Sequence, residues 1–374
     1  MQFLILSCNT GEGHNSAAKA LKAFFEQQGD SCEIKDALSF WSPEKSKFIS
    51  RGHVFIYRNL PKLFGISSRF VENHPPKDGN ESFMYDLVTR GCESLLEYLN
   101  STNFDAVICT HIFSGMMMTK LRRMNRSNIP CYLIATDYTC SPGFAENDLD
   151  GYFIPHEMLR NEFVKNGVPD KKIIASGIPI NPAFYSSLSK EEAKRKLHLP
   201  ADKRIVLLTC GSMGCGPMKA LTHDLPELLP CDVRLVVICG NNRRLFKSLT
   251  KDAGLFENLS VIGYTKRMPI YMDAASLIIT KPGGLSTTEA AAKGLPMIFI
   301  NAVPGCETHN LDFFVSNGLA ATKDSDDGLC RLVCHYLMHQ DKLDRISRKL
   351  KADFSPFAVK EIYDYITSSD KENT

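Results

Sequence analysis

Short apolar runs alternate with amphipathic stretches along the whole chain, and this alternation predicts the fold. The apolar runs have the length and β-branched character of strands buried in a parallel sheet, and each ends in a turn rich in glycine or polar residues. We expect strands at residues 3–8, 106–110, 131–135, 204–209, 233–239, 259–262, 277–280 and 297–300. We expect helices, among others, at 17–27, 81–100 and 343–366. Strand, turn and helix recur in this order in both halves, which predicts an α/β protein with two doubly wound, Rossmann-like domains that face a cleft.

The domain boundary is predicted from a break in this pattern. Residues 175–182 contain two prolines and a glycine between a strand-like run and a polar helix, as a linker does. The chain has 374 residues, 44% of them apolar, which is enough for two cores. We therefore expect an N-terminal domain over 1–178, a C-terminal domain over 179–345, and a final helical segment, 346–374, that packs back on the N-terminal domain.

Composition narrows the class of protein. The net charge is only +2, so overall charge favours neither a nucleic-acid partner nor a membrane partner. The 13 cysteines form no C-x-x-C pair and no Cys/His spacing typical of zinc, so we expect free thiols in a cytosolic enzyme, with no metal and no cofactor. No signal peptide is expected because Met1 leads directly into a strand, and no apolar run approaches the roughly 20 residues that cross a bilayer.

One segment nevertheless has the pattern of a membrane-surface element. No acidic residue occurs between Lys45 and Val71, where basic residues alternate with aromatic and aliphatic ones. The predicted membrane contacts are Lys47, Phe48, Arg51, Phe55, Arg58, Lys62, Phe64 and Arg69. They predict a peripheral protein on the anionic, cytoplasmic face of the cell membrane. The alternatives are a core helix with a solvated basic face and, less favoured, RNA binding. A second basic cluster, Lys120, Arg122, Arg123 and Arg126, is predicted on a helix that could face the same membrane.

The strongest candidate site lies at 277–310. A buried strand ends in a Pro-Gly-Gly turn that contains Gly283 and Gly284 and opens an Ala-rich helix, and the exposed N–H groups of such a helix start attract an anion without a metal. Glu289, about one turn into the helix, is placed to accept from hydroxyl groups beside that anion. Glu307 and Asn310 follow the next strand, at the sheet edge where α/β proteins bind ligands. The pattern predicts a ligand with a phosphate and several hydroxyls; the alternative is an ordinary βαβ unit.

A candidate base lies in the first half. His14 follows Gly13 in a second glycine-rich turn, at the mouth of a helix, where a neutral imidazole can accept a proton. His111 and Asp137 end two other predicted strands at the same sheet edge. His14 could equally be a capping residue, and His111 and Asp137 could be ordinary strand-end residues. A base in one domain and a phosphate-and-hydroxyl pocket in the other predict group transfer from a nucleotide-activated donor.

Acidic pairs that could hold a metal for such a reaction are not convincing. Asp148 with Asp150, and Asp324 with Asp326, have Asp-x-Asp spacing, but neither pair follows a predicted strand. We interpret both as chance occurrences, and we expect no metal site.

Five motifs, in order, resemble those of the monogalactosyldiacylglycerol synthases and the bacterial processive diacylglycerol glucosyltransferases, relatives of the peptidoglycan lipid-linked N-acetylglucosaminyltransferase. The resemblance covers nearly the whole chain. The motifs are TGEGHNSAA at 10–18, TDY at 136–138, GSMG at 211–214, KPGGLSTTEA at 281–290 and PGCETHN at 304–310.

The resemblance implies a GT-B fold and an inverting, metal-independent transfer of a hexose from UDP-glucose or UDP-galactose to diacylglycerol or its glycolipid product. His14 would be the base, with Gly13, His111 and Asp137 on the acceptor side. Glu289 would hold the ribose, the backbone near Tyr264 the uracil, and Glu307 with Asn310 the sugar. The diphosphate would lie between two glycine turns. The remaining donor-side candidates are Gly211, Ser212, Met213, Gly214, Asn241, Gly283, Gly284, Ser286 and Thr287.

Three positions depart from the family pattern and bear on donor and acceptor choice. Glu12 replaces the middle of three glycines, Cys306 replaces a glutamine, and Ser141 lies where many members have a histidine. Other functions therefore remain open: a transferase with another lipid-linked or soluble acceptor, an epimerase of the same fold, or a non-catalytic UDP-sugar sensor.

Overall fold

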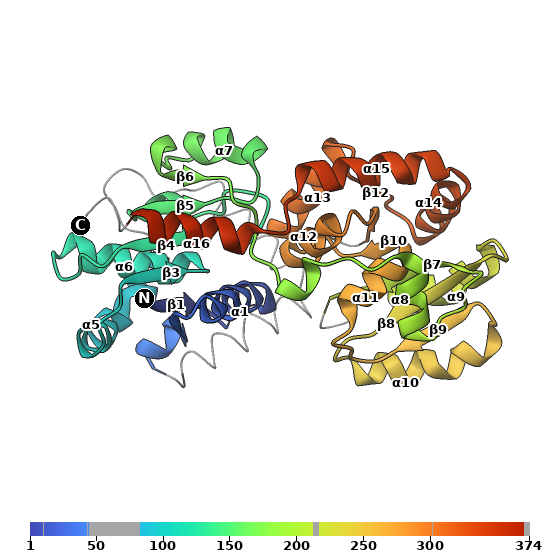
Figure 1. Ribbon diagram of the computed structural model, residues 1–374, viewed down its shortest axis with the longest axis horizontal. Coiled ribbons are helices and arrows are strands. Elements are labelled where there is room, and N and C mark those ends of the chain that lie inside the picture. The colour runs from blue at the N-terminus through green and yellow to red at the C-terminus, as the bar shows by residue number, and fades with distance from the viewer. Residues whose placement is uncertain (10, 43, 45–82, 212–216, 301, 370–374) are drawn as a thin grey trace. The chain divides into compact units, whose positions relative to one another are not determined.

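The structure is a computed structural model that describes residues 1–374 except 10, 43, 45–82, 212–216, 301 and 370–374. The chain divides into two compact units, each built around its own sheet (Figure 1). The first unit comprises Met1–Pro182, Val303–Cys306 and Phe357–Thr374, and the second comprises Ala183–Ala302 and Glu307–Pro356. The first unit thus ends four residues beyond the boundary predicted at 178, and its last segment comes from the C-terminus.

The first unit contains a six-stranded parallel sheet in the order β2-β1-β3-β4-β5-β6. Its strands are β1 Gln2–Ser7, β2 Ser31–Asp36, β3 Ala106–Cys109, β4 Cys131–Ile134, β5 Gly151–Phe153 and β6 Ile173–Ile174. Its helices are α1 Glu12–Gln27, α4 Phe83–Val88, α5 Cys92–Ser101, α6 Ile112–Arg123, α7 Arg160–Lys165 and α16 Ala358–Ser369. Short 3₁₀ turns are η1 Ala37–Phe40, η2 Thr89–Gly91, η3 Phe144–Glu146, η4 Glu157–Leu159 and η5 Asp170–Lys172. The strand order reverses between β1 and β3, which is where doubly wound sheets bind ligands.

The second unit contains a six-stranded parallel sheet in the order β12-β11-β10-β7-β8-β9. Its strands are β7 Arg204–Thr209, β8 Val233–Ile238, β9 Leu259–Ile262, β10 Ala275–Thr280, β11 Met297–Phe299 and β12 Ala320–Thr322. Its helical segments are α8 Lys190–Leu197, α9 Met218–Leu228, α10 Arg243–Asp252, η7 Ala253–Leu255, α11 Met268–Ala274, α12 Gly284–Ala292, α13 Cys306–Ser316, α14 Asp326–Met338 and α15 Gln340–Asp353. The 3₁₀ turn η6 Pro182–Phe184 spans the boundary between the units. This is the Rossmann strand order, and its switch point lies between β7 and β10. The prediction of two α/β domains is confirmed.

The central strands are apolar because helices cover both faces of each sheet. Every residue of β10 is buried, as are all residues of β3 and β4. Such continuous runs are typical of parallel strands, and they leave polar residues to gather at the strand ends. The chemistry of each unit is therefore concentrated along the carboxyl edge of its sheet.

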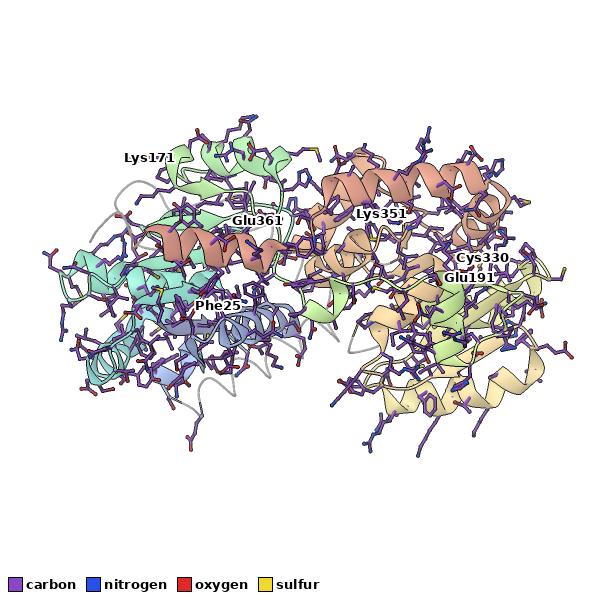
Figure 2. All side chains as sticks on the ribbon, in the orientation of Figure 1. Phe25, Lys171, Glu191, Cys330, Lys351 and Glu361 are labelled. Carbon is purple, nitrogen blue, oxygen red and sulfur yellow. The ribbon has the colours of Figure 1, made fainter. Side chains whose placement is uncertain are left out.

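The C-terminal helix packs on the first unit through an aromatic cluster. The ring of Tyr363, on α16, lies 5.0 Å from that of Phe25 on α1, and Phe25 in turn lies 4.8 Å from Phe3 on β1. Tyr363 also donates a hydrogen bond of 2.8 Å from its hydroxyl to Asp30. Figure 2 labels Phe25 on α1 and Glu361 on α16. The final helix thus completes the N-terminal core.

Two helices predicted as continuous are divided in the structure. The helix predicted over 343–366 ends with α15 and resumes as α16, because Pro356 cannot continue a helical hydrogen-bond ladder. The helix predicted over 81–100 is interrupted by a 3₁₀ turn at Thr89–Gly91. At Gly91 a Cβ would lie 2.6 Å from the backbone nitrogen of Trp41, so only glycine fits where these two backbones approach closely.

Candidate functional site

The first group of candidate residues lies at the switch point of the first sheet. His14 is in the first turn of α1, after β1, while Thr110 and His111 follow β3 and Thr136 follows β4. These four residues are the His14 cluster. The helix predicted at 17–27 begins five residues earlier than expected, because α1 starts at Glu12. Parallel strands end at one edge, so the topology brings together residues that are up to 122 positions apart.

The protonation state of His14 is set by its neighbours. Its Nδ1 lies 2.8 Å from the backbone oxygen of Thr110 and 2.9 Å from Oγ1 of Thr136. A carbonyl oxygen can only accept, so we assign the ring proton to Nδ1. In the neutral ring the lone pair then lies on Nε2, which is the atom that would accept a proton from a substrate.

His111 has a structural role as well as a place beside His14. Its Nδ1 accepts a hydrogen bond of 3.1 Å from the backbone N–H of Phe113 and so caps α6. Its ring lies edge-on to that of His14, with centroids 4.5 Å apart. Because Nδ1 is an acceptor, the proton of the neutral His111 ring lies on Nε2. One histidine of this pair therefore presents a donor at Nε2 and the other an acceptor.

The start of α1 is held by a chain of polar side chains. Ser7 Oγ donates to Asn15 Oδ1 at 2.7 Å, Asn15 Nδ2 donates to Asn9 Oδ1 at 2.9 Å, and Asn9 Nδ2 donates to Asp36 Oδ2 at 2.9 Å. These bonds connect β1 and β2 to the helix turn that carries His14. Glu12, at the departure from the family pattern, is exposed in the first helical turn, where its charge complements the helix dipole.

The loop after β4 is fixed by a residue that sequence reasoning missed. Glu162 on α7 accepts 2.7 Å hydrogen bonds from Thr139 Oγ1 and from the backbone N–H of Cys140. Asp137 is half-buried in this loop, next to Thr136. Burial raises the pKa of Cys140 to about 12, so this thiol stays protonated at neutral pH and does not serve as a nucleophile. No motif spacing connects Glu162 to the loop, which explains why the sequence did not reveal it.

The second group of candidate residues lies at the carboxyl edge of the second sheet. Gly283 is the N-cap residue of α12, which begins at Gly284, and a glycine has no side chain with which to cap the helix. The first N–H groups of a helix have no partner within the helix, and the dipole adds positive potential there. Residues 281–289 are called the Gly283 turn below. Ser286 is half-buried on it, whereas Thr287 is fully buried and donates from Oγ1 to the backbone oxygens of Gly283 and Gly284.

The other donor-side candidates follow neighbouring strands of this sheet. Gly211 follows β7, Asn241 follows β8 and Tyr264 follows β9, all at the carboxyl edge. Gly211 has φ +65°, a left-handed conformation that favours glycine. Asn241 and Tyr264 are exposed. Ser212, Met213 and Gly214 lie outside the described residues.

Glu289 has an unusual environment for a carboxyl group. Residue 289 as a whole is half-buried, but its carboxyl group is enclosed. Burial raises the pKa of this carboxyl group to about 8. Among the described residues, no charged group contributes to this shift. The group is therefore mainly protonated at pH 7 and can both donate and accept hydrogen bonds. A strongly shifted carboxyl beside an open helix terminus is typical of a binding site.

A nearly buried ion pair borders the Gly283 turn. Lys281 Nζ lies 3.1 Å from Glu307 Oε1, and the two side chains are only 11% and 13% exposed. Glu307 is in the first turn of α13. Sequence reasoning singled out Glu307 but not Lys281, although the lysine follows a buried strand directly. The pair sets the position of the Glu307 carboxylate beside the turn.

Asn310 stabilises the turn from behind. Its side chain is completely buried, and its Nδ2 donates a 2.9 Å hydrogen bond to the backbone oxygen of Pro282. This amide therefore helps to shape the turn, and the contact with the sugar that the resemblance implies stays a prediction. The carbonyl it binds belongs to a buried residue, which makes the bond costly to lose.

Replacing Asn310 with alanine is expected to lower the free energy of unfolding by about 1–3 kcal/mol, because Pro282 loses a hydrogen-bond donor in a buried place. Urea unfolding followed by circular dichroism measures this loss. Asn317 is the matched control: it makes a 2.7 Å bond to the backbone oxygen of Phe313 near the other end of the same helix. Equal losses for Asn310→Ala and Asn317→Ala would contradict a special role for Asn310.

The second basic cluster makes contacts within the protein, and the prediction that it lies on one helix is wrong for Arg126, because α6 ends at Arg123. Arg122 pairs with Asp150, Arg126 with Glu93 at 2.6 Å, and Lys120 donates to Thr89 Oγ1 at 3.1 Å. These contacts weaken the prediction that the helix faces a membrane. The predicted membrane contacts between Lys47 and Arg69 lie outside the described residues.

In the described part of the chain, no group of three or more His, Cys, Asp or Glu side chains is placed to hold a metal ion. The helices of the same part include none with the length and apolar character required to span a bilayer. All described cysteines are free thiols.

Comparison with known proteins gives consistent matches for both units. The profile of the monogalactosyldiacylglycerol (MGDG) synthase family matches residues 14–180, and that of the glycosyltransferase family 28 C-terminal domain matches 205–315. A processive diacylglycerol β-glucosyltransferase of Staphylococcus saprophyticus is 30% identical over 271 residues, covering 72% of this chain and 68% of the relative. The enzyme of the same description from Bacillus subtilis is 28% identical over 353 residues, covering 93% and 90%.

Solved structures share the fold at lower identity. MurG of Acinetobacter baumannii superposes with a TM-score of 0.63 at 18% identity, covering 98% of this chain and all of that one. A UDP-GlcNAc 2-epimerase of Neisseria meningitidis, solved with UDP-GlcNAc bound, gives a TM-score of 0.63 at 15% identity, covering 98% and 100%. At such identity these likenesses establish the GT-B fold, which both a transferase and an epimerase use.

Proposed function

Because this chain belongs to the family of monogalactosyldiacylglycerol synthases and processive diacylglycerol glucosyltransferases, which are GT-B glycosyltransferases, we propose that it transfers a hexose from a UDP-sugar to diacylglycerol or a glycosyldiacylglycerol. The hexose is glucose or galactose, and the transfer inverts the anomeric centre at a membrane surface. The observation that carries the chemistry is the contact of His14 Nδ1 with the Thr110 carbonyl, because it leaves Nε2 as the basic atom.

The donor is assigned to the carboxyl edge of the second unit. The diphosphate accepts hydrogen bonds from the N–H groups that open α12, with Ser286 as a hydroxyl donor. The ribose hydroxyls bind Glu289, and the sugar hydroxyls bind Glu307, whose carboxylate is positioned by Lys281. The backbone near Tyr264 meets the uracil. This assignment is supported by the uncapped helix and by the raised pKa of Glu289.

The proposed reaction is a direct displacement. His14 Nε2 removes the proton from the acceptor hydroxyl, and the resulting oxygen attacks the anomeric carbon of the donor sugar. The bond between that carbon and the diphosphate oxygen breaks, so UDP leaves with the bonding electrons. The helix dipole stabilises the negative charge that develops on the diphosphate. We therefore expect transfer to continue in the presence of EDTA.

Replacing Thr136 with valine is expected to lower kcat about three- to tenfold, because the His14 ring loses one of the two groups that contact Nδ1. The pH profile of kcat/KM should shift as well, since the proton on Nδ1 is held less firmly. Thr136→Ser keeps the hydroxyl and should restore both. An unchanged profile in the valine variant would show that Thr136 does not position His14.

The whole proposal is tested by incubating the protein with diacylglycerol vesicles and radiolabelled UDP-glucose, UDP-galactose or UDP-N-acetylglucosamine, and measuring label in the lipid phase. We expect label in the lipid phase from UDP-glucose or from UDP-galactose. Conversion of the UDP-sugar without label in lipid would indicate an epimerase, and UDP binding without any turnover would indicate a sensor. Sedimentation with anionic vesicles tests the proposed membrane surface separately.

A further inference from the structure

A cavity lies at the amino edge of the second sheet, away from the Gly283 turn. Its volume is about 160 Å³. Ala275 and Ser276, which line it, are the first residues of β10, and Pro296 directly precedes β11. The proposed donor site lies at the carboxyl ends of these strands, so the cavity is a separate place on the same unit. The charged residues in its wall are Lys190, Asp273, Lys293, Asp344 and Lys351.

The charges of this wall are only partly neutralised. Lys293 Nζ lies 2.9 Å from Asp273, with side chains 1% and 5% exposed, so this pair is closed and buried. Asp344 accepts a 2.8 Å hydrogen bond from Gln340. In the described part of the chain, no carboxylate lies within 4.0 Å of the ammonium group of Lys190 or Lys351, the remaining two charges of the wall. Three lysines face two aspartates, which gives the cavity one net positive charge.

The ammonium group of Lys190 is partly buried, and among the described residues no carboxylate lies within 4.0 Å of it. The residue is exposed by area, but its Nζ lies 3.4 Å from Ser276 Oγ inside the cavity, and burial lowers its pKa. Asp344 and Glu191 oppose this shift, whereas Lys194 and Lys351 add to it. The exposed part of Lys190 is therefore its stem, and its charged end lies toward the cavity. A partly desolvated cation of this kind is stabilised by a bound anion.

One face of α15 lines the same cavity. Gln340, Asp344, Ser347 and Lys351 line the cavity at spacings of four, three and four residues, which places them on one side of the helix. The stem of Lys351, labelled in Figure 2, crosses over Gly294. A Cβ at Gly294 would lie 2.6 Å from two carbons of this stem, and its φ of +63° also favours glycine. Gly294 therefore leaves room for Lys351 to reach the cavity.

We propose that this cavity binds a phosphate-type oxyanion. Lys190 and Lys351 supply the charge, and the hydroxyls of Ser276 and Ser347 supply further donors. The anion is either free phosphate or the phosphate of a glycerol phosphate head group. The proposal does not depend on the donor site, because it rests on residues at the opposite edge of the sheet.

Equilibrium dialysis of the full chain with ³²P-labelled inorganic phosphate tests the proposal. Saturating UDP is present throughout, so that the proposed donor site does not contribute. We expect about one phosphate bound per chain, with at least tenfold weaker binding in Lys190→Gln and in Lys351→Gln. Lys171→Gln removes the same charge from an exposed position in the first unit and is the matched control.

Competition and variant binding distinguish free phosphate from a glycerol phosphate head group, and both from the absence of a site. Stronger competition by glycerol 3-phosphate than by unlabelled phosphate supports the head group, and equal or weaker competition supports free phosphate. Thermal melting shows that the lysine variants are folded. Absence of binding, or binding that is equal in the wild type and in the folded Lys190→Gln and Lys351→Gln variants, would overturn the proposal.

Discussion

Replacing His14 with alanine is expected to lower kcat by about 10²–10⁴-fold, the usual contribution of a positioned general base. The contact of Nδ1 with the Thr110 oxygen at 2.8 Å leaves Nε2 as the only basic ring atom, so the loss should fall on the chemical step. The affinity for UDP should remain nearly unchanged, because His14 and the Gly283 turn belong to different compact units. Steady-state kinetics and UDP titration measure the two quantities.

His14→Asn is the informative companion variant. The asparagine Nδ2 occupies the place of Nδ1 and can donate to the Thr110 oxygen, but it cannot accept a proton at neutral pH. We therefore expect it to be as inactive as His14→Ala while keeping the wild-type melting temperature. A kcat within about threefold of the wild type in either variant would remove His14 from the role of base.

Replacing Glu289 with glutamine is expected to make the protein more stable at neutral and alkaline pH but poorer at binding the donor. Burial raises the pKa of this carboxyl to about 8, so ionisation of the native protein is costly, and a neutral amide avoids that cost. The amide lacks the hydroxyl of the protonated carboxyl, and losing one neutral hydrogen bond to the ribose, worth about 0.5–1.5 kcal/mol, should raise the KM for the donor about 2- to 10-fold.

The pH dependence of this effect has a defined direction. Below about pH 4.5, the ordinary pKa of a glutamate, Glu289 is protonated in both the folded and the unfolded chain. Its ionisation therefore does not make the free energy of unfolding depend on pH in that range. Between about pH 4.5 and 8 the unfolded chain releases the proton and the folded chain retains it, so stability falls as the pH rises. Above pH 8 the loss levels off. The stability advantage of Glu289→Gln should therefore grow over this window to about 2–4 kcal/mol.

Thermal melts of wild type and Glu289→Gln at pH 5 and pH 8.5 measure this divergence, and UDP titration at the same pH values measures donor affinity. Glu307→Gln is the control, because Glu307 is paired with Lys281 and its removal should not stabilise the protein at high pH. Parallel stability curves for wild type and Glu289→Gln would show that the carboxyl is not buried as described.

The sequence was sufficient for the architecture because parallel strands covered on both faces have an unmistakable composition. The residue runs that form β7 and β10 are apolar throughout, and each ends in glycine or polar residues. Tight backbone contacts were not predictable in the same way. The close approach at Gly91 is to Trp41, which is 50 residues earlier in the chain, and no local pattern indicates that contact.

The site was predicted in outline but not in its supporting contacts. Motif positions identified His14, Glu289 and Glu307, since each follows a strand and a turn. The groups that set their chemical state come from elsewhere: a backbone oxygen at Thr110 and an ammonium group at Lys281. The sequence gives no information on which backbone oxygen a side chain contacts, so the tautomer of His14 follows only from the structure.

The anomeric configuration of the lipid product tests the central claim most directly. UDP-glucose and UDP-galactose carry an α-linked sugar, and a single displacement assisted by His14 must invert it. Proton NMR of the glycolipid made by the wild-type protein should therefore show a β-linked hexose, and His14→Ala should make almost none. An α-linked product would contradict direct displacement by an acceptor that His14 deprotonates.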